Sequence, residues 1–94
     1  MFNNHRYLTK GVQSEIPIGL QLFMWGCIGK LPEECDYFQV FKLENLGGIQ
    51  KITHFSEQPT YRREYLIPTG NPITSKVYII DSDTYSTMLL AEEY

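Results

Sequence analysis

The chain has 94 residues, of which 43% are hydrophobic and 20% are charged, and its formal net charge is −3. This composition is typical of a single globular domain over residues 1–94, long enough to bury a core without a disulfide or a metal ion. The acidic balance argues against generic binding to nucleic-acid phosphates, which depends on Lys and Arg side chains.

The N-terminal third of the chain predicts a short extended segment followed by one long helix. Ser14 is a good N-cap for this helix. Pro17 is tolerated in the first turn, where backbone N–H groups have no helical acceptor. Gly29 marks the other end, so we expect the helix to run to about Lys30.

This predicted helix is apolar on two sides. At about 100° per residue, a broad apolar stripe faces the predicted core. A second stripe, formed by Ile18, Leu22 and Trp25, lies on another side at positions i, i+4 and i+7. Either residues 88–90 cover the second stripe, or a partner molecule does, because monomers seldom leave large apolar patches exposed. Gly19 and Gly26 also share one side, which allows close approach by another backbone.

From residue 37 the hydrophobic period changes from 3.6 to 2, which predicts strands. The last segment also allows a short helix, but its Thr and Tyr residues favour a strand. Short turns join the strands, so we expect antiparallel pairing. The predicted fold class is α+β, with one main N-terminal helix packed on a mainly antiparallel sheet of four to five strands. The expected strands are residues 37–43, 49–55, 61–67, 76–80 and 84–90.

The first long strand is apolar on both sides. Phe38 and Val40 point one way, whereas Tyr37, Phe41 and Leu43 point the other way. A sheet with one solvent-facing side alternates more cleanly. The sheet, like the helix, therefore carries more apolar surface than a minimal monomer would use.

Three side chains could act as catalytic groups, but the sequence shows none of the neighbouring residues that catalysis would require. His54 titrates near neutrality and is a candidate general base. Cys35 follows two glutamates, and neighbouring carboxylates raise the pKa of a thiol. Asp81 lies in an Asp-Ser-Asp sequence typical of a turn. No orienting acid or metal-ligand spacing accompanies them, so we expect no catalytic, cofactor or metal site, and a protein that is not an enzyme.

Tyr61, Arg63 and Tyr65 are the best candidates for a nucleic-acid contact, because alternate residues of a strand share one face. Arg62 points to the opposite face, so the two arginines do not form one patch. The aromatic signature of RNA-recognition strands is absent. A solvated cross-strand ion pair is the simpler explanation for Arg63.

Several features favour a cytoplasmic location. The N-terminus has no apolar run behind its charged residues, so no secretory signal is expected. The apolar run over residues 16–28 is shorter than the about 20 residues needed to cross a bilayer, so no membrane association is expected. Cys27 and Cys35 do not make a disulfide framework, which suits a reducing compartment.

Four segments share a likeness to known proteins: Arg6–Val12, Leu20–Trp25, Asp36–Phe41 and Ser86–Tyr94. Together they resemble a family of small proteins from Gram-positive bacteria, catalogued as a staphylococcal-type domain of unknown function. The resemblance spans most of the chain and implies a soluble bacterial protein without an assigned activity. It supplies no catalytic or binding residues.

These observations predict a small non-enzymatic protein that acts by association. It would self-associate, for example as a homodimer, or bind a protein partner through Ile18, Leu22 and Trp25. The alternative is a nucleic-acid-associated module that uses the strand face around Arg63. A third hypothesis is an enzyme centred on His54, Cys35 or Asp81.

Overall fold

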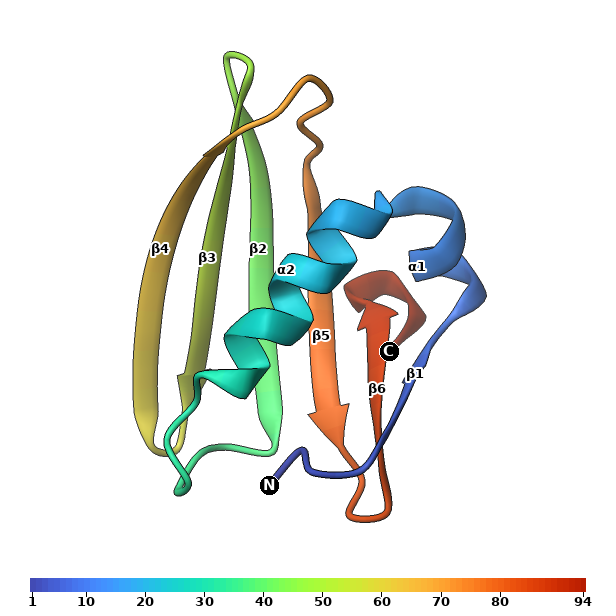
Figure 1. The fold of residues 1–94 in the computed structure, drawn as a ribbon, viewed down its shortest axis with the longest axis vertical. Coiled ribbons are helices and arrows are strands. Elements are labelled where there is room, and N and C mark those ends of the chain that lie inside the picture. The colour runs from blue at the N-terminus through green and yellow to red at the C-terminus, as the bar shows by residue number, and fades with distance from the viewer.

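The computed structural model describes residues 1–94 as one six-stranded mixed sheet with two α-helices on one face (Figure 1). The strand order is β1-β6-β5-β2-β3-β4, and all neighbours are antiparallel except β1, which runs parallel to β6. The elements are β1 (His5–Leu8), α1 (Lys10–Glu15), α2 (Ile18–Gly29), β2 (Phe38–Leu46), β3 (Ile49–Glu57), β4 (Thr60–Pro68), β5 (Ser75–Asp81), β6 (Tyr85–Leu90) and a 3-10 turn, η1 (Ala91–Glu93).

The predicted fold class, one main helix on an antiparallel sheet of four to five strands, is wrong. The protein is mostly sheet, with 47% of its residues in strands and 22% in helices, and it has a sixth strand. This strand, β1, pairs in parallel with β6, so that His5 lies opposite Tyr85. Four residues are too few for the alternation of polar and apolar residues to predict a strand, and the partner strand β6 lies at the other end of the chain.

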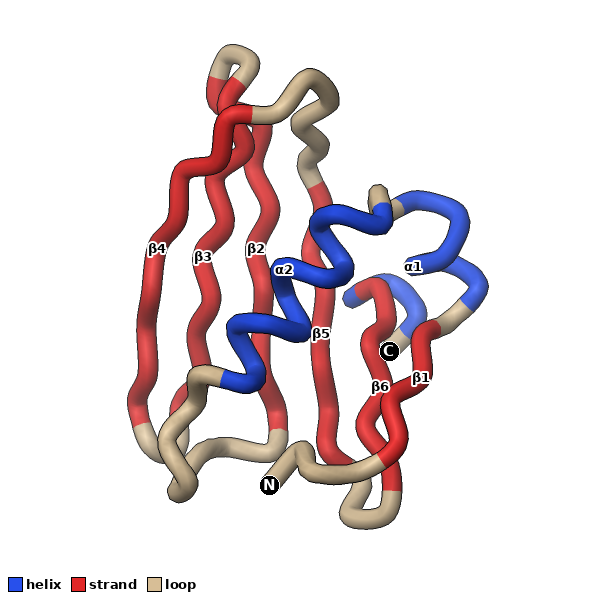
Figure 2. The backbone as a smooth tube through the Cα atoms, viewed as in Figure 1, coloured by secondary structure: helices blue, strands red, loops and turns tan.

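The order of the strands also departs from a simple sequence of hairpins. β5 pairs with β2 and not with β4, its predecessor in the chain. The β4–β5 connection therefore crosses one end of the sheet, passing β3 and β2 (Figure 2). This crossover places β2 between two long partners at the centre of the sheet.

The prediction for the N-terminal third is wrong around Ser14: the chain up to Val12 was predicted to be extended, but Lys10–Glu15 form a separate helix, α1, and the predicted helix begins only at Ile18, as α2. α1 begins after Thr9, whose side chain accepts a hydrogen bond from a backbone N–H, and Ser14 lies inside α1 and caps nothing. Pro17 disfavours a helical conformation for the preceding residue, and Ile16 is extended. A side chain satisfies a backbone group at the break: the buried Gln21 Nε2 donates a hydrogen bond to the Ile16 carbonyl oxygen at 2.8 Å. α2 then ends at Gly29, as predicted.

The later strands agree with the sequence pattern. β2 to β6 overlap the five predicted segments, and the last segment is a strand and not a helix. Gly47 and Gly48, in the turn between β2 and β3, both have positive φ, at 60° and 97°. The turn is fastened by the Asn45 side chain, which accepts a hydrogen bond from the Gly48 N–H.

The core lies between α2 and the face of the sheet that α2 covers, which we call the inner face. α2 crosses this face diagonally (Figure 1). With 12 residues it is about 18 Å long and about 10 Å wide, whereas six strands extend about 24 Å between the outermost two. Phe2, which precedes β1, and Val12 of α1 also belong to the core. The inner face supplies Phe41, Leu43, Ile52, Val77, Ile79, Met88 and Leu90 to the core.

Both α-helices lie on the inner side (Figure 1). The opposite side, which we call the outer face, is formed by the alternate side chains of the strands. As predicted, Phe38 and Val40 lie on this face, while Phe41 and Leu43 point into the core. No helix of the structure is long and apolar enough to cross a membrane.

Candidate functional site

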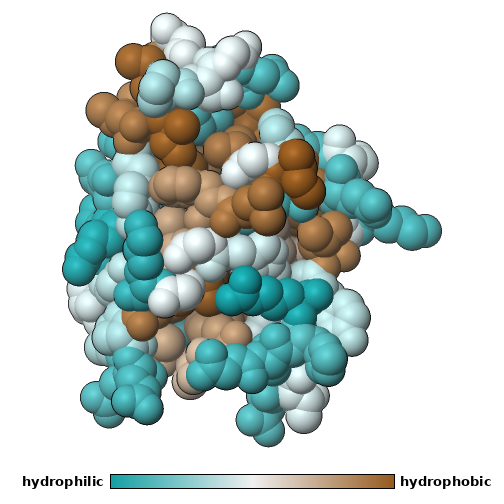
Figure 3. Space-filling view, viewed as in Figure 1, coloured by the Kyte–Doolittle hydropathy of each residue, from teal (hydrophilic) through white to brown (hydrophobic).

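The side of α2 that faces away from the sheet has no polar side chain. We call it the outward strip, and it consists of Ile18, Gly19, Leu22, Gly26 and Gly29, all of which are exposed. Ile18 is 69% exposed and Leu22 is 66% exposed. Brown apolar side chains gather along this part of the surface, between teal hydrophilic ones (Figure 3). A helix that covers a core in water normally presents charged or polar residues here.

The three glycines of the outward strip are not required by the fold of a single chain. A Cβ atom added to Gly19, Gly26 or Gly29 would meet nothing within 4 Å. A glycine inside a helix costs about 1 kcal/mol relative to alanine. Gly26 and Gly29 leave the C-terminal half of the strip without side chains, whereas Ile18 and Leu22 project from its N-terminal half.

Trp25 does not belong to the outward strip, although the sequence places it in the second stripe with Ile18 and Leu22. Its side chain is only 8% exposed and is part of the core cluster. The Arg6 guanidinium covers it, 4.8 Å from the ring centroid. Arg6 comes from β1, the unpredicted strand that extends the sheet toward this side of α2. The set of residues available for docking is therefore Ile18 and Leu22 with the glycines.

Tyr61, Arg63 and Tyr65 share the inner face of β4, but their rings are not free for stacking. The Tyr65 ring packs edge-on against Phe23 of α2, with centroids 5.1 Å apart. The Arg63 guanidinium lies 4.7 Å from the centroid of the Tyr61 ring. The structure thus brings the three residues to one face and then uses them in contacts with their own chain.

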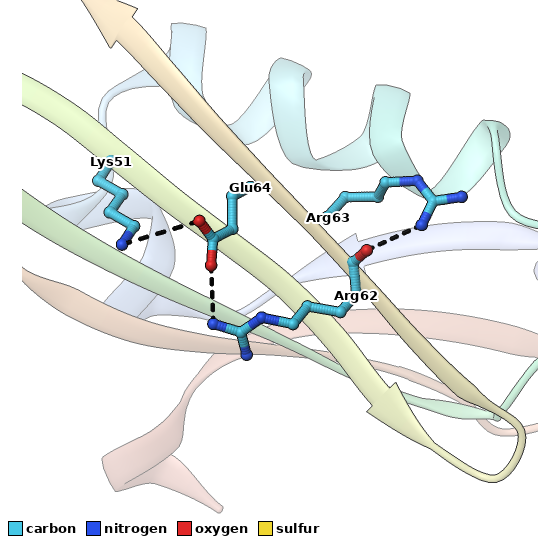
Figure 4. Close-up of polar contacts among 4 residues, drawn as sticks. All are labelled: Lys51, Arg62, Arg63 and Glu64. Atoms are coloured by element: carbon cyan, nitrogen blue, oxygen red, sulfur yellow. Dashed lines mark hydrogen bonds and ion pairs between the residues drawn. The ribbon is translucent and has the colours of Figure 1, made fainter.

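Arg62 and Arg63 leave β4 in opposite directions, as the sequence predicts (Figure 4). On the outer face, Glu64 accepts from Arg62 at 2.8 Å and lies 4.0 Å from the Lys51 ammonium. The hydrogen bond from Arg62 and the charge of Lys51 lower the pKa of Glu64. The cross-strand ion pair of this region is therefore Lys51 with Glu64, to which Arg62 adds a pair within β4, and Arg63 takes part in neither.

His54 lies on the inner face of β3 and is completely buried. Its Nε2 is 2.7 Å from the Gln39 Oε1, and its ring stacks on Phe41 with centroids 4.1 Å apart. Burial, with a smaller contribution from the charge of Arg63, lowers the pKa of His54 from 6.5 to about 4. The imidazole is therefore neutral at pH 7, and the Nδ1 atom has no hydrogen-bond partner.

Gln39 pairs with His54, a contact that was not predicted from the sequence. Both lie on the inner face, at positions that alternate with Phe38, Val40 and Phe55 on the outer face. The period of two would have placed them in the core. Gln39 also donates to the Asp36 carbonyl oxygen at 2.8 Å, so the pair ties the loop after α2 to the centre of the sheet.

The two cysteines and Asp81 do not form a catalytic or metal-binding cluster, and the carboxylate of Asp81 already accepts hydrogen bonds from its own chain. Burial raises the pKa values of the Cys27 and Cys35 thiols, with the carboxylates of Asp36 and Asp81 as smaller causes at Cys35. Although burial by itself would raise the pKa of Asp81, hydrogen bonds from the Phe2 and Asp83 N–H groups lower it. No group of three or more His, Cys, Asp or Glu side chains lies close enough to hold a metal ion.

Comparison with known proteins gives a family and one solved fold. The family described as "Staphylococcal protein of unknown function (DUF960)" matches residues 5–93. The fold is similar to that of a protein of unknown function from Enterococcus faecalis, known from a crystal structure, with a TM-score of 0.82 and 24% sequence identity. The likeness covers 97% of this chain and 91% of that one. No curated protein matches the sequence.

The lowered pKa of the buried His54 predicts that the stability of the fold depends on pH. Because its pKa is lower in the folded state, its contribution to stability is complete above about pH 6.5 and declines as the pH falls toward 4. We expect the free energy of unfolding in urea to fall by about 2 kcal/mol between about pH 7.5 and pH 5. His54→Gln should remove most of this pH dependence, whereas His5→Gln, at an exposed position, should retain it. Equal pH dependence in the wild type and His54→Gln would refute this account.

Proposed function

The chain belongs to the family of staphylococcal proteins of unknown function (DUF960), and on this premise we propose that it acts by association, with a second copy of itself on the outward strip of α2. Membership in the family and likeness to the Enterococcus faecalis fold bring no activity with them. The support for the proposal is the exposed, uncharged surface of α2. The predicted stripe is retained without Trp25, which is buried.

The energetic support comes from two large side chains. Fully burying a Leu or Ile side chain contributes about 1.5–3 kcal/mol. Ile18 and Leu22 leave about two thirds of their surface in water in a single copy. Because the strip carries no charge, a partner would cover it without stranding an ion in the interface.

The shape of the strip favours a second copy in antiparallel orientation. Its large residues, Ile18 and Leu22, lie in the N-terminal half of α2, and Gly26 and Gly29 lie in the C-terminal half. In an antiparallel pair with a two-fold axis near the middle of α2, Leu22 of each copy faces Gly26 of the other. The interface is then self-complementary, as two-fold symmetry requires. The observation that carries the proposal is the placing of exposed large residues in one half of the strip and glycines in the other.

Electrostatics favours the same orientation. Antiparallel helices place opposite ends of their dipoles side by side. Glu15 is exposed just before α2 and Lys30 is exposed just after it, so antiparallel pairing brings unlike charges together at each end. A parallel pair would oppose Leu22 to Leu22 and like charges to like charges.

We also propose a cytoplasmic location, on the evidence of the cysteines. Both cysteines are free, Cys27 in the core and Cys35 partly buried. Free thiols persist in a reducing compartment.

Sedimentation equilibrium of Leu22→Glu tests the surface. The wild type should be a dimer, and Leu22→Glu should weaken it about tenfold or more, because a carboxylate would be buried against the second copy. Leu66→Glu is the matched control: Leu66 is also 66% exposed but lies on the outer face. A wild type that stays monomeric at high concentration would rule the proposal out, as would equal effects of the two substitutions.

Gly26→Ala separates the needs of the helix from those of the interface. Nothing lies within 4 Å of the added Cβ atom in one copy, so helix propensity should stabilise the monomer by about 0.5–1 kcal/mol. The same methyl group would hold the two helices apart and weaken the dimer. Urea unfolding at low concentration measures the first effect and sedimentation the second. An unchanged or tighter dimer would contradict close approach at Gly26.

A further inference from the structure

We propose that the outer face of the sheet binds single-stranded nucleic acid, with Lys42 and Lys76 contacting phosphate and Phe38 and Tyr78 stacking on bases. This surface is separate from the outward strip of α2, on the other side of the sheet, and the inference does not depend on self-association. Three observations carry it: a cluster of rings, a pair of lysines that form no ion pair, and a hollow lined by the rings and by Lys76.

The rings lie at the centre of the outer face. Phe38 of β2 and Tyr78 of β5 have centroids 4.8 Å apart, and Tyr94 contacts both edge-on, at 5.4 and 5.6 Å. A second pair, Tyr7 and Tyr85, lies on the same face near the sheet edge, with centroids 5.9 Å apart. Aromatic side chains on an open sheet offer flat surfaces to successive bases, at about 1–3 kcal/mol per base.

The lysines lie beside the rings in an arrangement that costs stability. Lys42 is directly opposite Lys76 in the register of β2 and β5, and like charges in this position repel. Both are exposed, and neither forms an ion pair. The Lys76 ammonium is 5.9 Å from the centroid of the Tyr78 ring. A phosphate bound between the two lysines would relieve their repulsion within reach of a base on Tyr78.

The local charge of this face differs from that of the whole chain. Lys42, Lys51, Arg62 and Lys76 are the cations of the outer-face strands, and Glu44, Glu57 and Glu64 are their carboxylates; with Asp36, which lines the hollow on this face, the balance is four minus four, or zero. The chain as a whole carries −3. Glu64 already pairs with Arg62 and Lys51, so the cations left without an ion pair are Lys42 and Lys76, and the strand carboxylates left without one are Glu44 and Glu57. The acidic total is thus compatible with phosphate binding on this side.

A hollow of about 400 Å³ opens between these groups, lined by Tyr37, Phe38, Phe55, Lys76 and Tyr78 among others. This volume is in the range of sites that hold small planar ligands. Asp36 and Glu57 also line it. The two carboxylate oxygens of Asp36 accept hydrogen bonds from the Phe38 and Gln58 N–H groups, each at 3.0 Å. Because the rings extend from the hollow toward Tyr7 and Tyr85, a strand of several nucleotides fits the face better than a single nucleotide.

The test is fluorescence anisotropy of the full chain with end-labelled single strands of about ten nucleotides, poly-U and poly-dT. We expect binding at low salt that weakens with a log–log slope of about −1.4 for two phosphate contacts. Lys76→Glu should weaken binding about tenfold or more. Lys10→Glu, the same charge change on α1, should have a much smaller effect.

A second variant keeps the test independent of charge. Tyr78→Leu retains an apolar side chain and should weaken binding about fivefold or more through lost stacking. Emission from Trp25, buried on the other side of the sheet, reports whether each variant is folded. The proposal is overturned if neither strand binds at low salt, if Lys76→Glu and Lys10→Glu behave alike, or if uridine monophosphate competes as well as the oligonucleotide.

Discussion

The structure depends on one short helix covering one face of a wide sheet. The buried side of α2, with Leu20, Met24 and Trp25, supplies much of what packs against the inner face. Twelve residues cannot cover six strands. Phe2 and Val12 of α1 therefore also belong to the core, and Arg6 of β1 covers the Trp25 ring. This demand explains why the N-terminus folds back as a parallel strand beside the last one. It also explains why Trp25, which a simple helix pattern places toward solvent, is enclosed within a single chain.

Two surfaces expose apolar or aromatic side chains that the core does not bury, and their chemistry differs. The outward strip of α2 is apolar and uncharged, with large residues at one end and glycines at the other. The outer face combines rings with two lysines that form no ion pair. A surface of the first kind suits a protein helix of complementary shape, and one of the second suits an anionic, planar ligand. Because they lie on opposite sides of the sheet, both can be occupied at once.

The sequence predicted what local pattern controls and failed where distant segments decide. β2 to β6 follow from alternation of residue types, and the glycine turn at Gly47 follows from its demand for positive φ. β1 has only four residues, and its pairing with β6 depends on contacts across the whole chain. The helix break at Pro17 was visible but was assigned to a first turn. Ile18 and Leu22 lie on the surface as their spacing indicates, whereas the fate of Trp25 depended on the unseen strand.

In the proposed dimer, α2 pairs with α2 of a second copy in antiparallel register, with Leu22 against Gly26. Mixing two variants tests it most directly: Leu22→Lys and Gly26→Glu should each be monomeric alone, since each places an uncompensated charge in the interface. When they are mixed, one interface pair becomes Lys against Glu and the other keeps the native Leu against Gly. The account predicts a heterodimer in native mass spectrometry. A mixture that stays monomeric while the wild type dimerises, or variants that dimerise alone as the wild type does, would contradict it.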